Sequence, residues 1–172
     1  YQNKLMDGVQ GNAGYIGNTV LNAEGPMCVC GNRGCLDAYA GELALNRRYQ
    51  ELTNSDNESY YTMRAIMKLS RNGDAVSQKI LKDAAFYLGI TISNLIKRLE
   101  PKMVLIASCE PLKGTTYWNI MEETIKKYHI NEMETKLELR EAQLLEDDYA
   151  LGACCYVFEY LFETPRLSLA IL

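Results

Sequence analysis

The spacing of hydrophobic positions changes along the chain, and each change marks an expected element. The clearest pattern is an apolar stripe at helical spacing, which predicts one long helix of about six turns. Its members are Val76, Ile80, Ala84, Leu88, Ile92, Leu95 and Leu99. The residues Asn72-Gly73-Asp74 supply a turn and an N-cap before this stripe, and Pro101 ends it.

Shorter patterns predict the remaining elements. Helical spacing predicts helices over residues 36–52, 61–69, 117–129 and 150–162. A short strand is expected over 19–21, a strand over 103–107 and an extended segment over 136–145. The continuous apolar run at 103–107 is typical of a strand that is buried. Because strand, loop and helix alternate in the second half, the predicted fold class is α/β.

Composition limits the functions that this segment can carry. The chain has 172 residues, 48% of them hydrophobic, which suits one domain or one lobe of a larger protein. With 18 basic and 22 acidic side chains its net charge is −4, so it has no electrostatic footprint for nucleic acid. No apolar run approaches the length of a membrane span. The polar start at Tyr1 resembles neither an initiator methionine nor a signal peptide, so we expect a fragment of a longer protein.

Three closely spaced cysteines are the most specific chemical feature. Cys28, Cys30 and Cys35 can place three thiolates around one metal ion, and Gly31 and Gly34 supply the tight turns that such a knuckle needs. Soft thiolate ligands suit zinc, which prefers four ligands, so the fourth must come from elsewhere. The alternative is a metal-free knuckle of reduced or oxidised cysteines.

The other cysteines do not form a disulfide framework. Cys154 and Cys155 stand side by side in an apolar helical stretch, where we expect them to be buried as small hydrophobes. Cys109 is alone in a loop. This usage favours a reducing, cytoplasmic location. The single histidine, His129, ends a predicted helix, where interaction with the helix dipole and solvent is more typical than metal binding.

The first segment carries glycines at every third position, namely Gly8, Gly11, Gly14 and Gly17. Four repeats without proline do not make collagen. The spacing instead indicates backbone that adopts positive φ or passes close to a ligand or to neighbouring backbone.

Several of these segments together resemble the ROK family (repressors, open reading frames and sugar kinases). The resemblance is carried by the runs 11–18, 28–37, 72–75, 99–106 and 151–154, in that order. It implies an actin-like, ribonuclease-H-like ATPase fold, of which residues 1–172 form the C-terminal lobe with a cysteine knuckle insertion. It also implies that the N-terminal lobe, with its phosphate loop and catalytic aspartate, and any winged helix-turn-helix lie outside this chain.

The chain departs from the family pattern at the implied sugar site. Tyr15 stands where the family has a glutamate, and Asn18 stands where it has a histidine. In the family these two side chains grip sugar hydroxyls, and the histidine is also the fourth zinc ligand. Losing a charge-assisted hydrogen bond costs about 1.5–3 kcal/mol. We therefore expect a degenerate sugar site at Tyr15 and Asn18, with Tyr15 either stacking on a sugar or filling the pocket.

A second departure affects the implied nucleotide loop. Ala107, Ser108 and Cys109 occupy positions where family kinases carry glycines that let backbone amides approach phosphates. Their β-carbons crowd that approach, and Glu110 adds repulsion if it points inward. ATP binding is therefore not expected, and no residue is assigned a catalytic role.

Three functions remain open at this stage. The favoured one is the effector and dimerisation part of a ROK transcriptional regulator that senses a small sugar, works as a homo-oligomer and contacts DNA only through an upstream domain. The alternative is the C-terminal part of a ROK sugar kinase that transfers phosphate from ATP to a hexose. The third is a structural role in which apolar faces, such as that of the last helix, mediate assembly.

Overall fold

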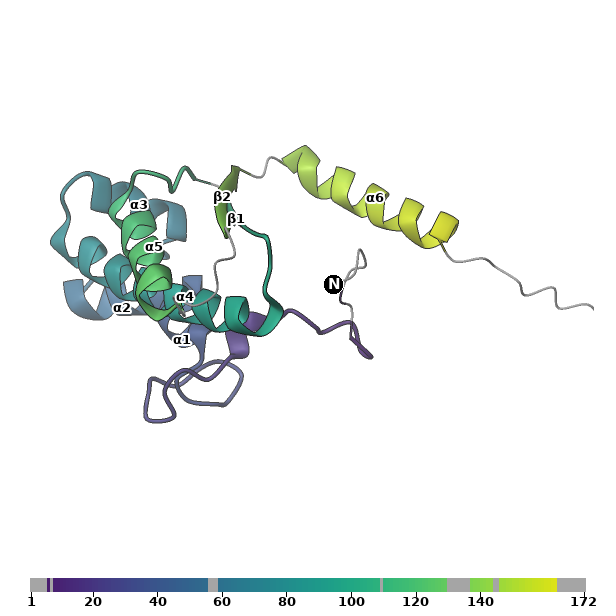
Figure 1. The fold of residues 1–172 in the computed structure, drawn as a ribbon. Helices are drawn as coiled ribbons and strands as arrows, with labels where there is room; N and C mark the ends of the chain where they lie inside the picture. The colour runs from purple at the N-terminus through teal and green to yellow at the C-terminus, as the bar shows by residue number, and fades with distance from the viewer. Residues whose placement is uncertain are drawn as a thin grey trace, which may run out of the picture.

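The computed structural model describes residues 6, 8–55, 59–108, 110–129, 137–143 and 146–163. Its elements in chain order are the 3-10 turn η1 (Ile16–Asn18), α1 (Leu36–Ala40), α2 (Glu42–Thr53), α3 (Met63–Arg71), α4 (Ala75–Leu99), β1 (Met103–Ser108), α5 (Thr116–Tyr128), β2 (Glu138–Gln143) and α6 (Glu146–Glu163). Figure 1 shows a helical body built from α1 to α5, with the two strands beside it and α6 set apart.

Helix α4 is the central element, and it confirms the long helix predicted from the apolar stripe. Asp74 caps its first turn by accepting a 2.6 Å hydrogen bond from the Ser77 N–H. At the other end, Glu100 takes the left-handed conformation with φ of 44° and donates its N–H to the Ile96 carbonyl. The sequence signals for both ends of this helix therefore act as expected.

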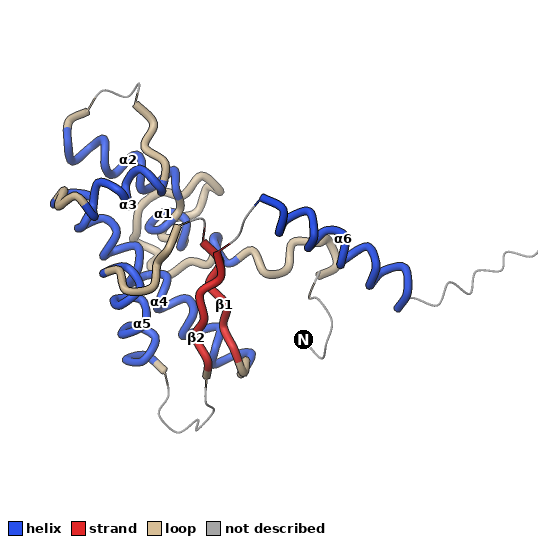
Figure 2. Tube along the Cα trace, turned by 90° about the horizontal axis from the view of Figure 1, so that it is seen from above, coloured by secondary structure: helices blue, strands red, loops and turns tan. Residues whose placement is uncertain are grey.

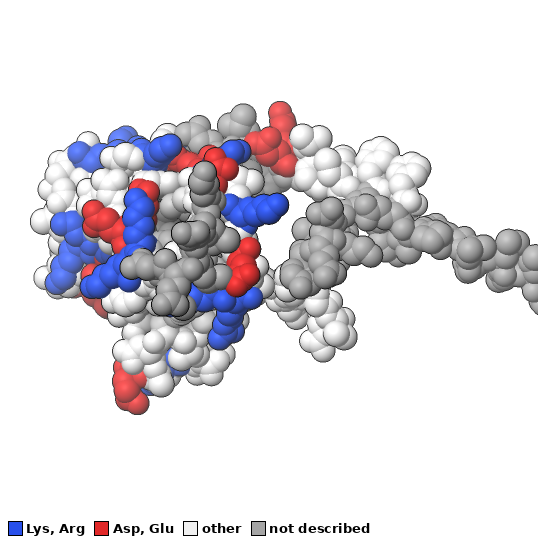
Figure 3. Space-filling view, in the orientation of Figure 1, with Lys and Arg blue, Asp and Glu red and all other residues white. Residues whose placement is uncertain are grey.

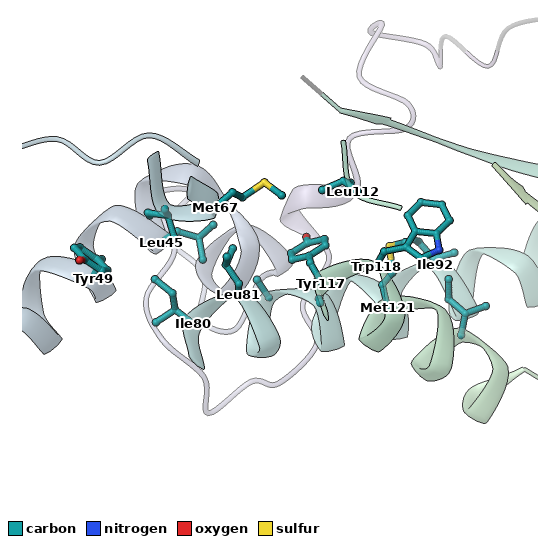
Figure 4. Packing of buried hydrophobic residues seen from close by; sticks show 14 of the residues in the cluster. Leu45, Tyr49, Met67, Ile80, Leu81, Ile92, Leu112, Tyr117, Trp118 and Met121 are labelled. Carbon is teal, nitrogen blue, oxygen red and sulfur yellow. The ribbon is translucent and has the colours of Figure 1, made fainter. Parts of the chain in front are cut away.

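The core lies where α2, α3 and α5 pack around α4. Each helix contributes side chains that solvent does not reach, among them Leu45, Ile66, Ile80 and Met121. Figure 4 shows apolar side chains from the four helices, among them Leu45, Met67, Ile80 and Met121, converging between the helices. The amphipathic stripe of each helix thus faces a shared interior, which is the usual source of stability for such helices.

The sheet consists of β1 and β2, which pair in parallel with Met103 opposite Glu138 and Ser108 opposite Gln143. The helices cover one of its sides (Figure 2), where Val104 and Ile106 pack against the core. The prediction of a buried strand at 103–107 is wrong in part, because Met103 and Leu105 keep exposed fractions of 45% and 56%. A continuous apolar run predicts two covered faces, and the described chain covers only one.

Two short-range predictions also differ from the structure. The helix expected over 36–52 is broken at Gly41, which has extended backbone and serves as the N-cap of α2. A β-carbon at Gly41 would lie 2.6 Å from the Asp37 carbonyl oxygen, so the break needs a glycine. The strand expected over 19–21 is reduced to a single antiparallel bridge between Val20 and Cys35.

The C-terminal helix begins earlier than predicted, at Glu146. Its described side chains are exposed, including Cys154 and Cys155, so the prediction that these two cysteines are buried is wrong. The reason is that α6 makes no extensive contact with the helices of the core, which leaves its described apolar side chains in contact with solvent. Of the remaining elements, α3, α5 and β2 shift by one to two residues from their expected bounds.

The described surface carries charges of both signs. On the face shown in Figure 3, lysine and arginine are interspersed with aspartate and glutamate over the helical body. None of the described helices combines the length and the hydropathy needed to cross a membrane.

Candidate functional site

The cysteine knuckle is held by a dense set of backbone hydrogen bonds. The Cys28 N–H donates to the Asn32 carbonyl at 2.8 Å, and the Gly31 N–H donates back to Cys28 at 3.1 Å. An antiparallel bridge between Met27 and Arg33 closes the same turn. Gly31 has φ of 90°, in a region that side chains rarely occupy. The turn therefore fixes the first two cysteines relative to each other.

The third cysteine is fixed from the other side of the knuckle. The backbone of the residue before it, Gly34, accepts from the Leu21 N–H at 2.8 Å, and the residue after it donates to the Thr19 carbonyl at 2.9 Å. Gly34 also has positive φ, and a β-carbon there would collide with the Asn22 carbonyl oxygen. Cys35 is the N-cap of α1 and is fully buried.

The structure brings the three thiols together. The sulfur atoms of Cys28, Cys30 and Cys35 all lie within 4.8 Å of one another, and the Cys30 and Cys35 sulfurs are 3.5 Å apart. Thiolates that share a tetrahedral zinc with bonds of about 2.3 Å lie about 3.8 Å apart, so the cluster is close to the required size. The donor set therefore fits a soft metal ion with three of the four ligands that zinc prefers.

The protonation of the thiols follows from their surroundings. The backbone N–H of Asn32 faces the Cys30 sulfur and lowers the pKa of that exposed thiol. Burial raises the pKa of the Cys35 thiol to about 12. A metal ion must therefore displace the proton from Cys35, which makes binding dependent on pH.

No histidine or carboxylate joins the three cysteines among the residues that the structure describes. Asn18 ends η1 and is exposed. His129 is the C-cap of α5, and its Nδ1 is buried without a hydrogen-bond partner in the described part of the chain.

A cavity of about 540 Å³ lies against the knuckle. The knuckle, α1, α2 and the segment before α3 all contribute to its lining, which comprises Tyr15, Met27, Cys28, Val29, Asp37, Ala38, Gly41, Glu42, Leu43, Ala44, Arg47 and Tyr60. Asn18 does not line this cavity, so the structure brings only one of the two expected sugar-site residues into it. Its lining combines apolar residues with acidic, basic and phenolic groups, a combination that suits a small polyhydroxylated ligand.

The acidic groups of the cavity are already engaged. The Tyr15 hydroxyl donates to the Asp37 carboxylate at 3.3 Å, and the negative charge of Asp37 raises the pKa of Tyr15. Glu42 accepts from the Tyr60 hydroxyl at 3.0 Å and from the Met63 N–H at 2.8 Å. Gly17 lies so close to the Asp37 carboxylate that a β-carbon would collide with it.

Sequence reasoning assigned no role to Asp37 or Glu42. Asp37 lies two positions beyond Cys35, in the first turn of α1. This closeness to the knuckle in sequence could have identified it as a residue of the site. Glu42 begins α2 directly after the break at Gly41. Because the sequence predicts a continuous helix there, it could not show that Glu42 lies at the cavity. The glycine series does what its spacing indicated, because Gly8, Gly11 and Gly14 have positive φ and Gly17 makes a close approach.

The loop after β1 is tied down by side chains on both sides. Ala107 is exposed at the end of β1, Ser108 accepts a 3.2 Å hydrogen bond from the Glu110 N–H, and Cys109 lies outside the described residues. The carboxylate of Glu110 forms ion pairs with Arg64 at 3.0 Å and with Arg71 at 3.3 Å. Its charge is therefore neutralised by arginines of α3.

The next part of this loop is held by β2. The carboxylate of Glu141 accepts hydrogen bonds from the backbone N–H groups of Leu112 and Lys113. Arg71 donates to the Pro111 carbonyl at 3.0 Å, so the loop is fixed between α3 and the sheet. A smaller cavity of about 330 Å³ lies beside it, between the end of α3, the start of α4 and the N-terminus of α5.

Comparison with known proteins identifies the family to which this architecture belongs. The ROK family model matches residues 1–159. The chain is 27% identical to a xylose repressor of Caldicellulosiruptor bescii over 96% of its length, and 27% identical to a glucokinase of Halalkalibacterium halodurans over 86%. It covers 44% and 48% of those two proteins, so it spans about half the length of the relatives that it matches.

A solved structure agrees with the sequence comparisons. The crystal structure of a ROK hexokinase from Thermus thermophilus superposes with a TM-score of 0.77 at 27% identity, over 94% of this chain and 52% of that one. The predicted fold class is thus confirmed as the actin-like ATPase fold of ROK kinases and regulators, with α helices packed on a parallel sheet. On these matches and this geometry, the chain belongs to the ROK family.

Proposed function

We propose that this chain is the effector-sensing and dimerisation part of a ROK transcriptional regulator that lacks kinase activity. DNA contact would come from another part of the protein, because the net charge of this chain is −4. The relatives named as xylose repressors share 27–29% of their residues with it over 94–96% of its length, which supports the regulator. A regulator needs only a ligand-dependent shift between conformations, so it can dispense with phosphoryl transfer.

The observation that carries the proposal is the structure of the loop after β1. Backbone that cradles a phosphate must present free N–H groups to it. Here the Leu112 and Lys113 N–H groups already donate to the Glu141 carboxylate, and Ala107 and Ser108 carry side chains at the end of the strand. A nucleotide would have to displace a carboxylate from these amides, which argues against ATP as a substrate.

The cavity beside the knuckle is the proposed effector site. Asp37 can accept hydrogen bonds from ligand hydroxyls, and the exposed ring of Tyr15 can stack on an apolar sugar face. The Tyr15 hydroxyl also competes with a ligand for Asp37. We therefore propose a degenerate sugar site that binds a small sugar more weakly than a site with a free carboxylate pair would.

The knuckle is the proposed zinc site. Cys28, Cys30 and Cys35 would hold the ion, which would brace the wall of the effector cavity because Cys28 lines that cavity. Zinc measured on protein purified without chelator should approach one equivalent. Cys30→Ser should weaken binding by at least ~100-fold, because even indirect partners of a metal contribute 10–100-fold. The control is Cys154→Ser on α6, which should bind normally.

Calorimetry and an enzyme assay test the regulator proposal. Titration with xylose, the sugar for which several relatives are named, should give saturable binding that Asp37→Asn weakens and Cys154→Ser leaves unchanged. Titration with magnesium-ATP should give no saturable heat. A coupled assay on the full-length protein should show no sugar phosphate formed from ATP, and turnover with any common hexose or pentose would overturn the proposal.

The second candidate is a ROK sugar kinase of the glucokinase type. The match to the glucokinase at 27% identity and the superposition on the Thermus thermophilus hexokinase favour it. Under this alternative Glu141 must release Leu112 and Lys113 when ATP arrives. ATP binding that becomes tighter in Glu141→Gln would therefore support the kinase over the regulator.

A further inference from the structure

Two of the three knuckle thiols are in contact and differ sharply in exposure. The sulfur atoms of Cys30 and Cys35 lie 3.5 Å apart. Cys30 is exposed to solvent, whereas Cys35 is fully buried beneath it. A solvent-borne reagent can therefore reach the Cys30 sulfur directly, whereas the Cys35 sulfur is shielded from solvent.

The backbone allows the two sulfurs to bond. A disulfide needs a sulfur separation of about 2.05 Å, so the gap must shorten by about 1.5 Å. Cys30 is followed by Gly31, and Cys35 is preceded by Gly34. Cys35 itself is anchored by the bridge to Val20, so the exposed Cys30 arm is the part that must move.

We propose that Cys30 and Cys35 form a peroxide-sensitive dithiol that closes to a disulfide. A hydroperoxide is the oxidant. The Cys30 thiolate attacks one peroxide oxygen, the O–O bond breaks, and the other oxygen leaves as water or alcohol after taking a proton. Cys30 is then a sulfenic acid, oxidised by two electrons. The Cys35 sulfur attacks the Cys30 sulfur, the S–S bond forms, and the hydroxyl leaves as water with the Cys35 proton.

Among the described residues only the three cysteines form the cluster, one fewer than the four ligands that zinc prefers. Closing the disulfide consumes two of the three thiolates and would release a bound ion. It also moves the Cys30 arm, and Cys28, two residues before Cys30, lines the effector cavity. The dithiol proposal goes beyond the proposed function and does not depend on it.

Peptide mapping after peroxide treatment tests the proposal. The metal-free, reduced 172-residue chain carrying Cys154→Ser and Cys155→Ser is treated with hydrogen peroxide, blocked with iodoacetamide, digested and analysed by mass spectrometry. We expect a Cys30–Cys35 cross-linked peptide, a loss of two alkylatable thiols, and recovery of both with dithiothreitol. A Cys28–Cys30 link, or Cys30 carried to sulfinic acid without a cross-link, would overturn the proposal.

Single variants assign the order of the two steps. Cys35→Ser should leave Cys30 as a sulfenic acid that dimedone traps in larger yield than in the parent chain, and Cys28→Ser should still form the Cys30–Cys35 link. Equal dimedone labelling of the parent and Cys35→Ser would contradict Cys35 as the resolving thiol. A zinc-loaded sample should lose its thiols more slowly, and if the chain binds no zinc, the metal-free mapping still decides between a dithiol and independent cysteines.

Discussion

At the scale of single residues, the knuckle depends on a glycine whose surroundings leave no room for a β-carbon. Gly34 has φ of 67°, its N–H donates to the Pro26 carbonyl at 2.8 Å, and a β-carbon there would collide with the Asn22 carbonyl oxygen. Gly31 also has positive φ, but among the described residues no atom beyond its own chain neighbours lies within 4 Å of its β-carbon position. A side chain at position 31 would therefore cause backbone strain alone, whereas a side chain at position 34 would cause backbone strain and a steric clash.

Replacing each glycine with alanine should reveal this difference. Gly31→Ala should destabilise the chain by about 1–2 kcal/mol, the usual cost of left-handed backbone for a side chain. Gly34→Ala should cost at least about 1 kcal/mol more, because backbone must also move to remove the overlap. Denaturant unfolding measures both values, and the rate at which Cys35 reacts with a thiol reagent should rise only in Gly34→Ala. Equal stability of the two variants would show that the clash relaxes without cost.

The contact between Tyr15 and Asp37 gives a prediction for pH. The negative charge of Asp37 disfavours the tyrosinate form, so it raises the pKa of Tyr15. Asp37→Asn removes that charge and should lower the pKa of Tyr15 towards the ordinary value for tyrosine, so that the phenol ionises at lower pH. The Cζ chemical shift of selectively labelled Tyr15, followed by NMR over a range of pH, reports this change. An unchanged Tyr15 pKa would mean that the pair is not formed in solution.

At the scale of elements, one close helix contact organises the core. Helices α4 and α5 approach each other at Gly89, where a β-carbon would lie 2.7 Å from the Thr124 β-carbon and 2.9 Å from the Met121 carbonyl oxygen. Gly89 has no unusual backbone, so packing alone requires it. This glycine sits inside a helix where it would otherwise cost about 1 kcal/mol relative to alanine.

Alanine at position 89 should therefore destabilise the chain, although alanine has the higher helix propensity. Gly89→Ala should destabilise the chain by about 1–3 kcal/mol, because the methyl group forces α5 away from α4. The matched control is Gly152→Ala in α6, where no described atom outside the local helix backbone lies within 4 Å of the β-carbon position. This change should be neutral or stabilise by up to about 1 kcal/mol. Thermal unfolding followed by circular dichroism compares the two. A stabilising Gly89→Ala would show that the helices can separate freely.

Elements were predictable from sequence where a pattern is long and its ends carry explicit signals. Helix α4 has both, with Asp74 at its start and Pro101 after its end. The 36–52 segment follows helical spacing, yet the helix breaks at Gly41, where the backbone is extended and a β-carbon would meet the Asp37 carbonyl oxygen. Hydrophobic spacing does not show this close approach. For the same reason, Glu42 could not be predicted as a residue of the site. The thiol cluster could be found because its three members are close in sequence.

At the scale of the whole molecule, stability is distributed unevenly. The helical body buries its apolar side chains around α4, whereas the described side chains of α6 are exposed, including Phe158 at 62% and Phe162 at 78%. These two rings stack on each other with centroids 5.8 Å apart, a local contact within one helix. Sequence patterns rank α6 among the most apolar segments, but they do not say which surface would cover it.

Hydrogen exchange should follow this division. An isolated helix of 18 residues is marginal in water, since most helical stability in proteins comes from packing. Amides of α6 should therefore exchange through local opening and lose protection early, whereas those of α4 should exchange only on global unfolding. Mass spectrometry of peptides from 146–163 and 80–96 of the same sample makes the comparison. Protection of α6 equal to that of α4 would mean that its apolar side chains are covered in solution. Repeating the measurement at higher dilution would then show whether a second copy covers them, because only an intermolecular contact is lost on dilution.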